Sequence, residues 1–203
     1  MTKRRAKPKY FIKTITKKEA NEILLPFHYL TSLSRGFRSG YNYGLFKEGI
    51  LVGVIIFTGF PVPELVKGIF DLGRTDQHGF FELSRLCIHP DIQSSEHNIA
   101  SWFVARAVRL LRKATEVRAI LSYADSAYHR GTVYQASNFL YYGLTAKKTD
   151  FWFKQADGTY RKHSRGPVKG RNGEWRSRTR KHRYLLVFDK SLRINWQQQD
   201  YPR

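Results

Sequence analysis

The first hydrophobic pattern along the chain predicts a helix over residues 14–25. Apolar side chains recur there at helical spacing, and Thr16 followed three positions later by Glu19 forms a capping box at its start. The next segment, residues 26–40, mixes His, Tyr, Ser and Arg with a proline and two glycines, which break helices. We therefore expect the helix to give way to a polar loop.

Two β-rich runs, at residues 41–46 and 50–58, are separated by three residues, which is the pattern of a hairpin with a short loop. Residues 60–79 contain two prolines and three glycines and predict an irregular insertion. The run FELSRLCI at residues 81–88 then predicts a third strand.

An amphipathic helix is expected after this strand, with Ser95 or Asn98 as its N-cap. Its apolar positions are Ile99, Trp102, Phe103, Ala107, Leu110, Leu111 and Ala114. The run RAILSYA at residues 118–124 predicts the next strand. Strand, helix and strand in this order predict a right-handed parallel crossover.

The last third of the chain predicts a second amphipathic helix over residues 132–143, ended by Gly143. Two strands follow it, FWFK at residues 151–154 and RYLLVFDK at residues 183–190, joined by a basic excursion. The complete order predicts an α/β domain in which a mixed central sheet is flanked by helices.

The composition fits one soluble globular domain of 203 residues. Hydrophobic residues make up 41% of the chain, and no apolar run approaches the roughly 20 residues of a membrane span. The basic amino terminus lacks the apolar stretch of a secretory signal, so we expect a cytoplasmic protein with no membrane partner. The single cysteine, Cys87, lies in an apolar run and is interpreted as a small buried hydrophobe.

A formal net charge of +20 favours a polyanionic partner, and double-stranded DNA is the leading one. Residues 1–9 hold five Lys or Arg, and residues 158–183 hold ten against a single acid, Glu174. Both runs are therefore candidate phosphate-binding arms.

These charges suggest a basic N-terminal arm over residues 1–13, a main domain over residues 14–190 that carries the basic insertion 158–183, and a tail over residues 191–203. Contacts to phosphate supply affinity without reading sequence. The candidate DNA contacts in the insertion are Lys162, Arg165, Lys169, Arg171, Arg176, Arg178, Arg180, Lys181 and Arg183.

Polar residues interrupt two predicted strands where alternation with apolar positions would be ordinary. Glu82, Ser84 and Arg85 lie inside one strand, and the SYAD run at residues 122–125 ends the next. Residues three apart on a strand point to opposite faces, so we expect Glu82 and Arg85 on opposite sides, with Ser84 on the side of Glu82. A charged group in a core strand needs an ion pair or a ligand, and we favour Arg85 as a contact to a donor or a phosphate.

Five sequence blocks, together with the order of elements, resemble the Mom family of phage proteins, which have the acyltransferase fold of the GNAT superfamily. The blocks are HY at 28–29, ELSRL at 82–86, SYAD at 122–125, HRGTVYQASN at 129–138 and KHRY at 181–184. The resemblance implies a transferase that adds a carbamoylmethyl group to the exocyclic amine of adenine in phage DNA and so protects that DNA from host restriction. The basic arms agree independently, since a broad DNA modifier needs sequence-independent phosphate affinity.

The exocyclic amine of adenine is a poor nucleophile, so its modification needs a base, a positioned electrophile and stabilisation of developing charge. The resemblance implies that Asp125 contacts or deprotonates the amine, although a turn aspartate has the same spacing. It implies Tyr134 as general acid to the leaving group; on the predicted helix Tyr141 shares its face and Asn138 lies one turn away. The candidate substrate- or donor-binding residues are Glu82, Ser84, Ser122, Tyr123, Gln135 and Asn138.

The loop pair His28 and Tyr29 flanks the acceptor groove in this fold. The resemblance implies a base at His28 and a ring at Tyr29 that stacks on an extruded adenine. His28, His129 and Asp125 are also the residue types of a facial metal site, so bound iron stays an open alternative.

The donor is the least determined part of the site. Proteins of this fold typically bind the pyrophosphate of coenzyme A through a Gly-rich turn at a helix N-terminus, but the corresponding turn here, DIQSSEHNIAS at residues 91–101, has no glycine. Acetyl-CoA and glycyl-tRNA are therefore both candidates. Glycine has the two carbons and the nitrogen that a carbamoylmethyl group requires, and a basic protein also suits RNA.

Two other functions fit the same residues. A GNAT-type N-acyltransferase would act on a protein or an aminoacyl-tRNA and leave adenine unmodified. A non-catalytic basic DNA-binding protein would keep its phenotype after replacement of Asp125 and Tyr134. Glu82 and Arg85 in a core strand favour an enzyme, because an architectural protein has no need of them.

Overall fold

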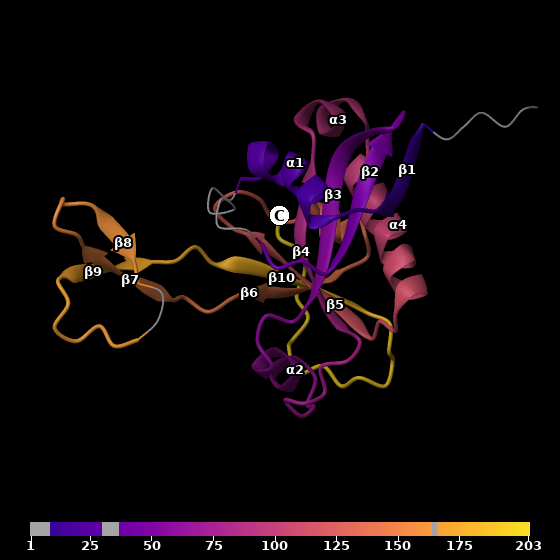
Figure 1. Ribbon diagram of the computed structural model, residues 1–203. Coiled ribbons are helices and arrows are strands. Elements are labelled where there is room, and N and C mark those ends of the chain that lie inside the picture. The colour runs from indigo at the N-terminus through magenta and orange to yellow at the C-terminus, as the bar shows by residue number, and fades with distance from the viewer. Residues whose placement is uncertain (1–8, 30–36, 164–165) are drawn as a thin grey trace, which may run out of the picture.

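The computed structural model describes residues 9–29, 37–163 and 166–203, which form one large mixed sheet between helices and a second, small sheet (Figure 1). The strands of the large sheet lie in the order β1-β2-β3-β4-β5-β10-β6, and those of the small sheet in the order β8-β7-β9. In chain order the elements are β1 (Tyr10–Thr14), α1 (Lys17–Phe27), β2 (Tyr41–Lys47), β3 (Ile50–Gly59), α2 (Glu64–Ile69), β4 (Phe80–Ile88), α3 (Pro90–Ser95), α4 (Ile99–Ala114), β5 (Ala119–Asp125), α5 (Thr132–Gln135), β6 (Leu140–Leu144), β7 (Thr149–Lys154), β8 (Tyr160–Lys162), β9 (Gly173–Ser177) and β10 (Lys181–Val187).

Two helices cover opposite faces of the large sheet. The apolar face of α4 packs in one core cluster with Ile55 of β3, and α1 packs in another with the next residue, Ile56. Both isoleucines are fully buried, so the centre of the sheet is core on each side. Cys87 belongs to the α1 cluster, which confirms its interpretation as a small buried hydrophobe.

Local signals in the sequence correctly predicted the first helix, the first hairpin and the parallel crossover. Helix α1 has its capping box: the Glu19 backbone N–H donates to Thr16 Oγ1 at 3.2 Å, and the Thr16 N–H donates to Glu19 Oε2 at 2.7 Å. β2 and β3 form the predicted antiparallel hairpin, in which Lys47 faces Ile50. β4 and β5 pair in parallel and are connected through α4, as the strand–helix–strand pattern predicted.

The predicted N-terminal arm is partly a strand of the sheet. β1 pairs antiparallel with β2 from Tyr10 to Thr14, so an arm over residues 1–13 is wrong at its C-terminal end. The Tyr10 hydroxyl donates to Glu96 Oε1 at 2.9 Å, and the Lys9 ammonium pairs with the same carboxylate. Residues 1–8 lie outside the described residues.

The predicted helix over residues 132–143 is right only for its first turn. Helix α5 ends at Gln135, and the chain turns at Asn138, whose φ is 63°, before it enters β6. The run FLYY is compatible with either period because short apolar runs do not separate helix from strand, and pairing with β10 decides for a strand. Tyr141 therefore does not share a helix face with Tyr134.

Two segments, one expected to be irregular and the other expected to be a separate tail, pack on a third core cluster. The insertion over residues 60–79 contains α2, whose residues Val66 and Ile69 are fully buried. The tail after residue 191 packs Leu192, Ile194 and Trp196 on the same cluster, so it is part of the domain.

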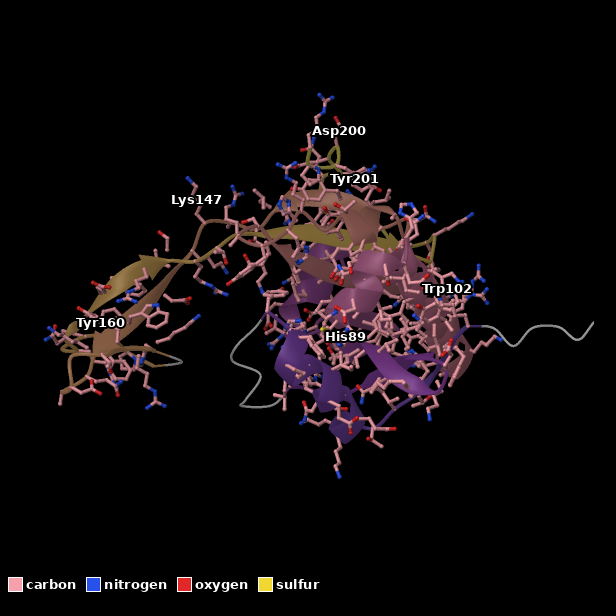
Figure 2. The ribbon with its side chains drawn as sticks, turned by 90° about the horizontal axis from the view of Figure 1, so that it is seen from above. His89, Trp102, Lys147, Tyr160, Asp200 and Tyr201 are labelled. Carbon is pink, nitrogen blue, oxygen red and sulfur yellow. The ribbon has the colours of Figure 1, made fainter. Side chains whose placement is uncertain are left out.

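The basic insertion folds, with β7, as a small antiparallel sheet, which we call the arm (residues 149–177). Figure 1 shows that it stands away from the body. The Arg176 guanidinium lies over the rings of Trp152, at 4.9 Å, and Tyr160, at 4.6 Å, and so joins the three strands on one face. Two antiparallel segments, residues 145–148 and 178–181, connect the arm to the body, and we call them the neck; Lys147 lies on it in Figure 2.

Candidate functional site

The candidate site opens where β4 and β5 separate, because their parallel ladder ends at the pair Leu83 and Ser122. Two cavities lie there, of about 850 Å³ and about 440 Å³, which we call the aromatic chamber and the basic chamber. The two chambers share five lining residues, which we call the junction: Glu82, Ser84, Arg85, Tyr123 and Lys181.

A bulge in β4 brings Glu82 and Arg85 to the junction together. Consecutive residues of β3 face Arg85 and Leu83, which leaves Ser84 as the extra residue in the ladder. A bulge shifts the alternation of side chains by one position. The expectation that Glu82 and Arg85 point to opposite faces is therefore wrong, since both line both chambers.

The junction combines opposite charges in a poorly solvated place. Burial raises the pKa of the Glu82 carboxyl, and the charges of Lys181 and Arg85 oppose that shift. The Arg85 guanidinium donates through Nη1 to the Ser84 carbonyl, whereas its buried Nε has no hydrogen-bond partner among the described residues. A buried donor without a partner is uncommon and marks a position where a ligand can bind.

Aromatic rings line one wall of the aromatic chamber. His28 stacks on Tyr29 with ring centroids 4.6 Å apart, and Tyr29 contacts Tyr128 at 4.8 Å and His129 at 6.0 Å. Tyr128 is 64% exposed, so a flat ligand can reach its ring. Sequence reasoning missed Tyr128; its place directly after the SYAD strand end was the signal that pointed to it.

Burial keeps the imidazoles of this chamber neutral. It lowers the pKa of His28 to about 4, and the positive charge of Arg85 adds to the effect. Burial also lowers the pKa of His129, against the opposing influence of Asp125. A neutral imidazole can accept a proton, so His28 is chemically able to act as a base.

Tyr134 projects from α5 into the same chamber and is only 5% exposed. Burial raises the pKa of its phenol to about 12, although a hydrogen bond with Ser122 opposes the shift. The Ser122 hydroxyl donates to the Leu83 carbonyl at 3.1 Å, so it ties Tyr134 to the last ladder pair. The phenol therefore keeps its proton at neutral pH.

Gly131 sets the position of α5. Its φ of 82° is unfavourable for residues with a side chain, and a Cβ there would lie 2.6 Å from the Tyr184 ring and 3.0 Å from the Tyr134 ring. The Tyr184 hydroxyl donates to the neighbouring Arg130 carbonyl. Glycine thus lets the loop lie directly against the core where the helix begins.

Asp125 holds a turn at the edge of the site and does not line either chamber. Its Oδ1 accepts the Ala127 N–H at 3.1 Å, and its Oδ2 accepts the Thr179 hydroxyl at 2.9 Å. The turn carries Tyr128 and His129, whose backbone N–H groups both donate to the Asp125 carbonyl. This geometry is that of a turn aspartate, which was the alternative role that the sequence left open for Asp125.

The remaining sequence candidates lie outside the chambers. Gln135 and Asn138 line neither chamber. His28, His129 and Asp125 do not form a metal site, because among the described residues no three His, Cys, Asp or Glu gather closely enough to hold an ion. Nothing in their arrangement fits bound iron.

The basic chamber is lined mainly by cations and hydroxyls. Arg38, Lys148 and Arg178 join the junction residues Arg85 and Lys181 on its wall, against a single acid. Its hydroxyl groups come from Ser84 and Tyr123 of the junction and from three threonines, Thr58, Thr145 and Thr179. Sequence reasoning missed Arg38 and Lys148, since neither belongs to a recognisable motif.

The cations predicted to bind DNA separate into three groups. Lys162 and Arg178 pair with Asp150, and Arg176 pairs with Glu174, all on the arm or its neck. Lys169 and Arg171 are exposed and form no ion pair with a described residue.

Two of the predicted cations serve the body of the protein. Arg183 donates to the Tyr142 carbonyl and lies 4.3 Å over the Trp196 ring, whereas Arg180 donates to the Thr145 carbonyl at 2.7 Å and so joins the two segments of the neck to each other where they meet the body. We therefore assign Arg183 to packing. Arg165 lies outside the described residues.

The turn before α4, where a pyrophosphate would approach a helix N-terminus, carries a carboxylate that is paired with two lysines, Lys9 and Lys47. Helix α3 fills this segment, and the Glu96 carboxylate follows it. The Lys9 ammonium and the Tyr10 hydroxyl bind that carboxylate and lower its pKa. Asn98, the N-cap of α4, has a φ of 59° and makes no side-chain cap bond.

Comparison with known families decides the classification. A model of the Mom protein family matches residues 9–203, nearly the whole chain. The chain belongs to the Mom protein family. It is 32% identical over 135 residues to the methylcarbamoylase Mom of Escherichia phage Mu, which covers 65% of this chain. The chain matches about half of that relative, 53% of its length.

Solved structures establish the fold of this Mom family member as that of GNAT acetyltransferases. The Bacillus subtilis acetyltransferase in complex with CoA has a TM-score of 0.50 and 13% identity, covering 89% of this chain and 98% of that chain. A GNAT family acetyltransferase from Elizabethkingia anophelis with acetyl-CoA bound has a TM-score of 0.50 and 11% identity, covering 90% and 100%. At this level of identity the likeness concerns the fold alone. In the part of the chain that the structure describes, no helix has the length and apolar character to cross a membrane.

Proposed function

We propose that this chain is a transferase that adds a carbamoylmethyl group to the exocyclic amine of adenine in phage DNA, and that the modification protects the DNA from host restriction. Membership of the Mom family and the methylcarbamoylase name of the Mu relative support it. The observation that carries the proposal is the junction, where a chamber suited to phosphates meets a chamber that holds a buried, protonated tyrosine.

Three side chains supply what the reaction requires. The amine nitrogen forms a bond to the donor carbon while the bond from that carbon to its leaving group breaks, one N–H proton leaves, and the leaving group gains one. Tyr134 gives its proton to the leaving group, and neutral His28 accepts the proton from the amine. Arg85, whose Nε has no hydrogen-bond partner among the described residues, stabilises the negative charge that develops on the molecule that donates the group.

Asp125 is a positioning residue in this proposal. Both of its carboxylate oxygens accept hydrogen bonds within the turn and the neck, so it fixes the segment that carries Tyr128 and His129. Tyr29 and Tyr128 offer the rings on which the adenine base stacks.

The donor is, in this proposal, glycyl-tRNA rather than acetyl-CoA. The turn before α4 has no glycine and is filled by α3, which disfavours a bound pyrophosphate. Transfer of glycine forms an amide at adenine N6 and breaks the ester to tRNA. The free glycine amine then attacks ring carbon C6, and the former N6 leaves C6 as the amide nitrogen, which yields the carbamoylmethyl group without an oxidant or a reductant.

Nucleoside mass spectrometry tests the function. We expect DNA from cells that express the protein to contain carbamoylmethyl adenine. The Arg85→Gln variant should lose most of the modification, whereas Arg109→Gln on the exposed side of α4 should keep it. An unmodified adenine pool together with acylated protein or tRNA would replace the proposal with an N-acyltransferase, which the acetyltransferase fold favours as the second candidate.

Labelled donors test which molecule supplies the transferred group. Purified protein is incubated with DNA and either glycyl-tRNA labelled in glycine or acetyl-CoA labelled in the acetyl group. Incorporation of label from glycyl-tRNA is the expected result. Incorporation from acetyl-CoA alone would remove glycyl-tRNA as the donor and leave the assignment of adenine as acceptor unchanged.

A further inference from the structure

The wall of the basic chamber is built by the neck of the arm. The Arg178 N–H donates to the Lys148 carbonyl at 2.8 Å, and the Thr145 N–H donates to the Lys181 carbonyl at 2.8 Å. The Lys181 N–H returns a bond to Thr145 Oγ1 at 2.9 Å. All four residues line the chamber, so the two hydrogen-bonded segments of the neck fix the backbone that carries its cations.

The chamber has more positive charge than its own acids can neutralise. Arg178 pairs with Asp150, and Arg38 donates to the carbonyls of Gly59 and Phe60. Lys148 and Lys181 form no ion pair with a described residue. The volume of about 440 Å³ falls within the roughly 300–1,000 Å³ typical of ligand sites.

The inner end of the chamber changes from cationic to aromatic. Tyr123 lies at the junction, with the Lys181 ammonium 5.9 Å from its ring centroid, and the Arg85 Nε is buried there without a partner among the described residues. From the neck across the junction, the lining therefore changes from cations, through one ring with the Arg85 guanidinium and the Glu82 carboxylate, to the aromatic chamber. A nucleotide has the same order, from its phosphate to its base.

We propose that the basic chamber binds a single nucleotide extruded from the duplex, with its flanking phosphates on Lys148, Arg178 and Lys181 and its base directed through the junction. This rests on the proposed function, since it names how the DNA substrate reaches that site. Extrusion costs roughly a few kcal/mol of lost stacking and pairing. Cations held by the neck offset this cost because they contact phosphates that come within reach only when the nucleotide leaves the stack.

The arm and the chamber then have separate roles in binding. The arm contacts intact duplex and contributes affinity, whereas the chamber stabilises the extruded state. Removing charge from the chamber should therefore abolish extrusion even when every DNA molecule is bound.

Permanganate oxidation of thymine tests this separation, because thymine reacts when its partner adenine has left the helix. A long natural duplex is saturated with the full-length protein, saturation is verified by gel shift, and reactive thymines are mapped. We expect discrete reactive thymines with the unmodified protein. The double variant Lys148→Gln with Arg178→Gln should lower their reactivity by about tenfold at full saturation.

A matched variant controls for the loss of two charges. Arg109→Gln with Lys113→Gln removes two exposed cations from α4, outside both chambers, and should leave the reactive thymines unchanged. Circular dichroism melting verifies that both double variants fold. Unchanged reactivity in the chamber variant, or the absence of reactive thymines with the unmodified protein, would overturn the inference. The proposed function is judged separately, by carbamoylmethyl adenine in cellular DNA.

Discussion

Burial determines the protonation state of the two groups on which the proposed chemistry depends. His28 is neutral because its pKa is about 4, and Tyr134 is protonated because its pKa is about 12. Neutral imidazole and neutral phenol can exchange protons with adenine and a leaving group at physiological pH. Neither group needs a charged partner for this, which suits a chamber lined by rings.

Tyr134→Phe should abolish the modification while the protein stays folded. The substitution removes one hydroxyl, which bonds to Ser122, so we expect a loss of stability of only about 1 kcal/mol and a loss of activity of at least about 100-fold. Nucleoside mass spectrometry and thermal melting measure the two effects. Tyr142→Phe is the matched control, because Tyr142 is similarly buried but lies in the third core cluster; equal activities of the two variants would exclude the general-acid role.

Acidification should destabilise the protein through His28. Its pKa is about 4 in the folded state against an ordinary value near 6.5, so between these values the unfolded state binds more protons. This contribution to stability is complete above about pH 6.5 and is lost as the pH falls toward 4. Melting temperatures measured across this range should fall less steeply for His28→Gln than for the unmodified protein, and parallel curves would contradict the assignment.

At the residue level, the sequence predicted which polar side chains gather at the cavities better than it predicted their orientation. Polar breaks in two strands correctly marked Glu82, Ser84, Arg85 and Tyr123 as residues that lie together. The bulge at Ser84 was not predictable, because it is a property of pairing with β3 and leaves no local pattern. The role of Asp125 was also undecided by spacing, since a turn aspartate and a base occupy the same position after a strand.

At the level of elements, the site depends on short segments placed between long regular ones. Helix α5 has only four residues and begins after Gly131, which adopts a positive φ against the core. The same few residues determine where Tyr134 points. A small displacement of this segment is therefore expected to move Tyr134 more than an equal displacement of α4 would.

Gly131→Ala should damage stability and activity together. The added Cβ is strained at a φ of 82° and lies 2.6 Å from the Tyr184 ring, so we expect a loss of about 1–3 kcal/mol and a lower melting temperature. Tyr134 should shift with the loop, and modification of adenine should fall by more than the loss of folded protein explains. Gly158→Ala, where φ is 82° and no atom lies within 4 Å, controls for the strain alone.

Element prediction failed where tertiary pairing overrides local periodicity. The first helix, the hairpin and the parallel crossover followed from capping and alternation. The structure of residues 132–143 did not follow from local signals, because the apolar half of this segment pairs with β10 as strand β6. The apolar pattern in this segment spans too few residues to decide between a helix and a strand.

At the level of the whole molecule, two bodies of different character are joined by the neck. The body holds the three apolar cores, and the arm sequence contains seven Lys or Arg in residues 150–176. No described arm residue belongs to one of the three cores. Stability and duplex affinity are therefore expected to be separable properties of this chain.

Replacing residues 150–176 with Asn-Gly should leave the body folded and weaken DNA binding. Thr149 and Ser177 face each other in the β7–β9 ladder, so a two-residue turn can join them. We expect a melting temperature within about 5 °C of the original and a shallower dependence of log affinity on log salt, by about 0.9 for each phosphate that the arm no longer neutralises. Fluorescence anisotropy with labelled duplex measures the slope; an unchanged slope would show that the arm does not contact phosphates.

The paired segments of the neck have an evolutionary consequence. An appendage whose two ends meet at one cross-strand pair can be lengthened, shortened or exchanged by a single recombination event without interrupting the domain beneath it. Members of the family can thus diversify this appendage while inheriting one unaltered central sheet.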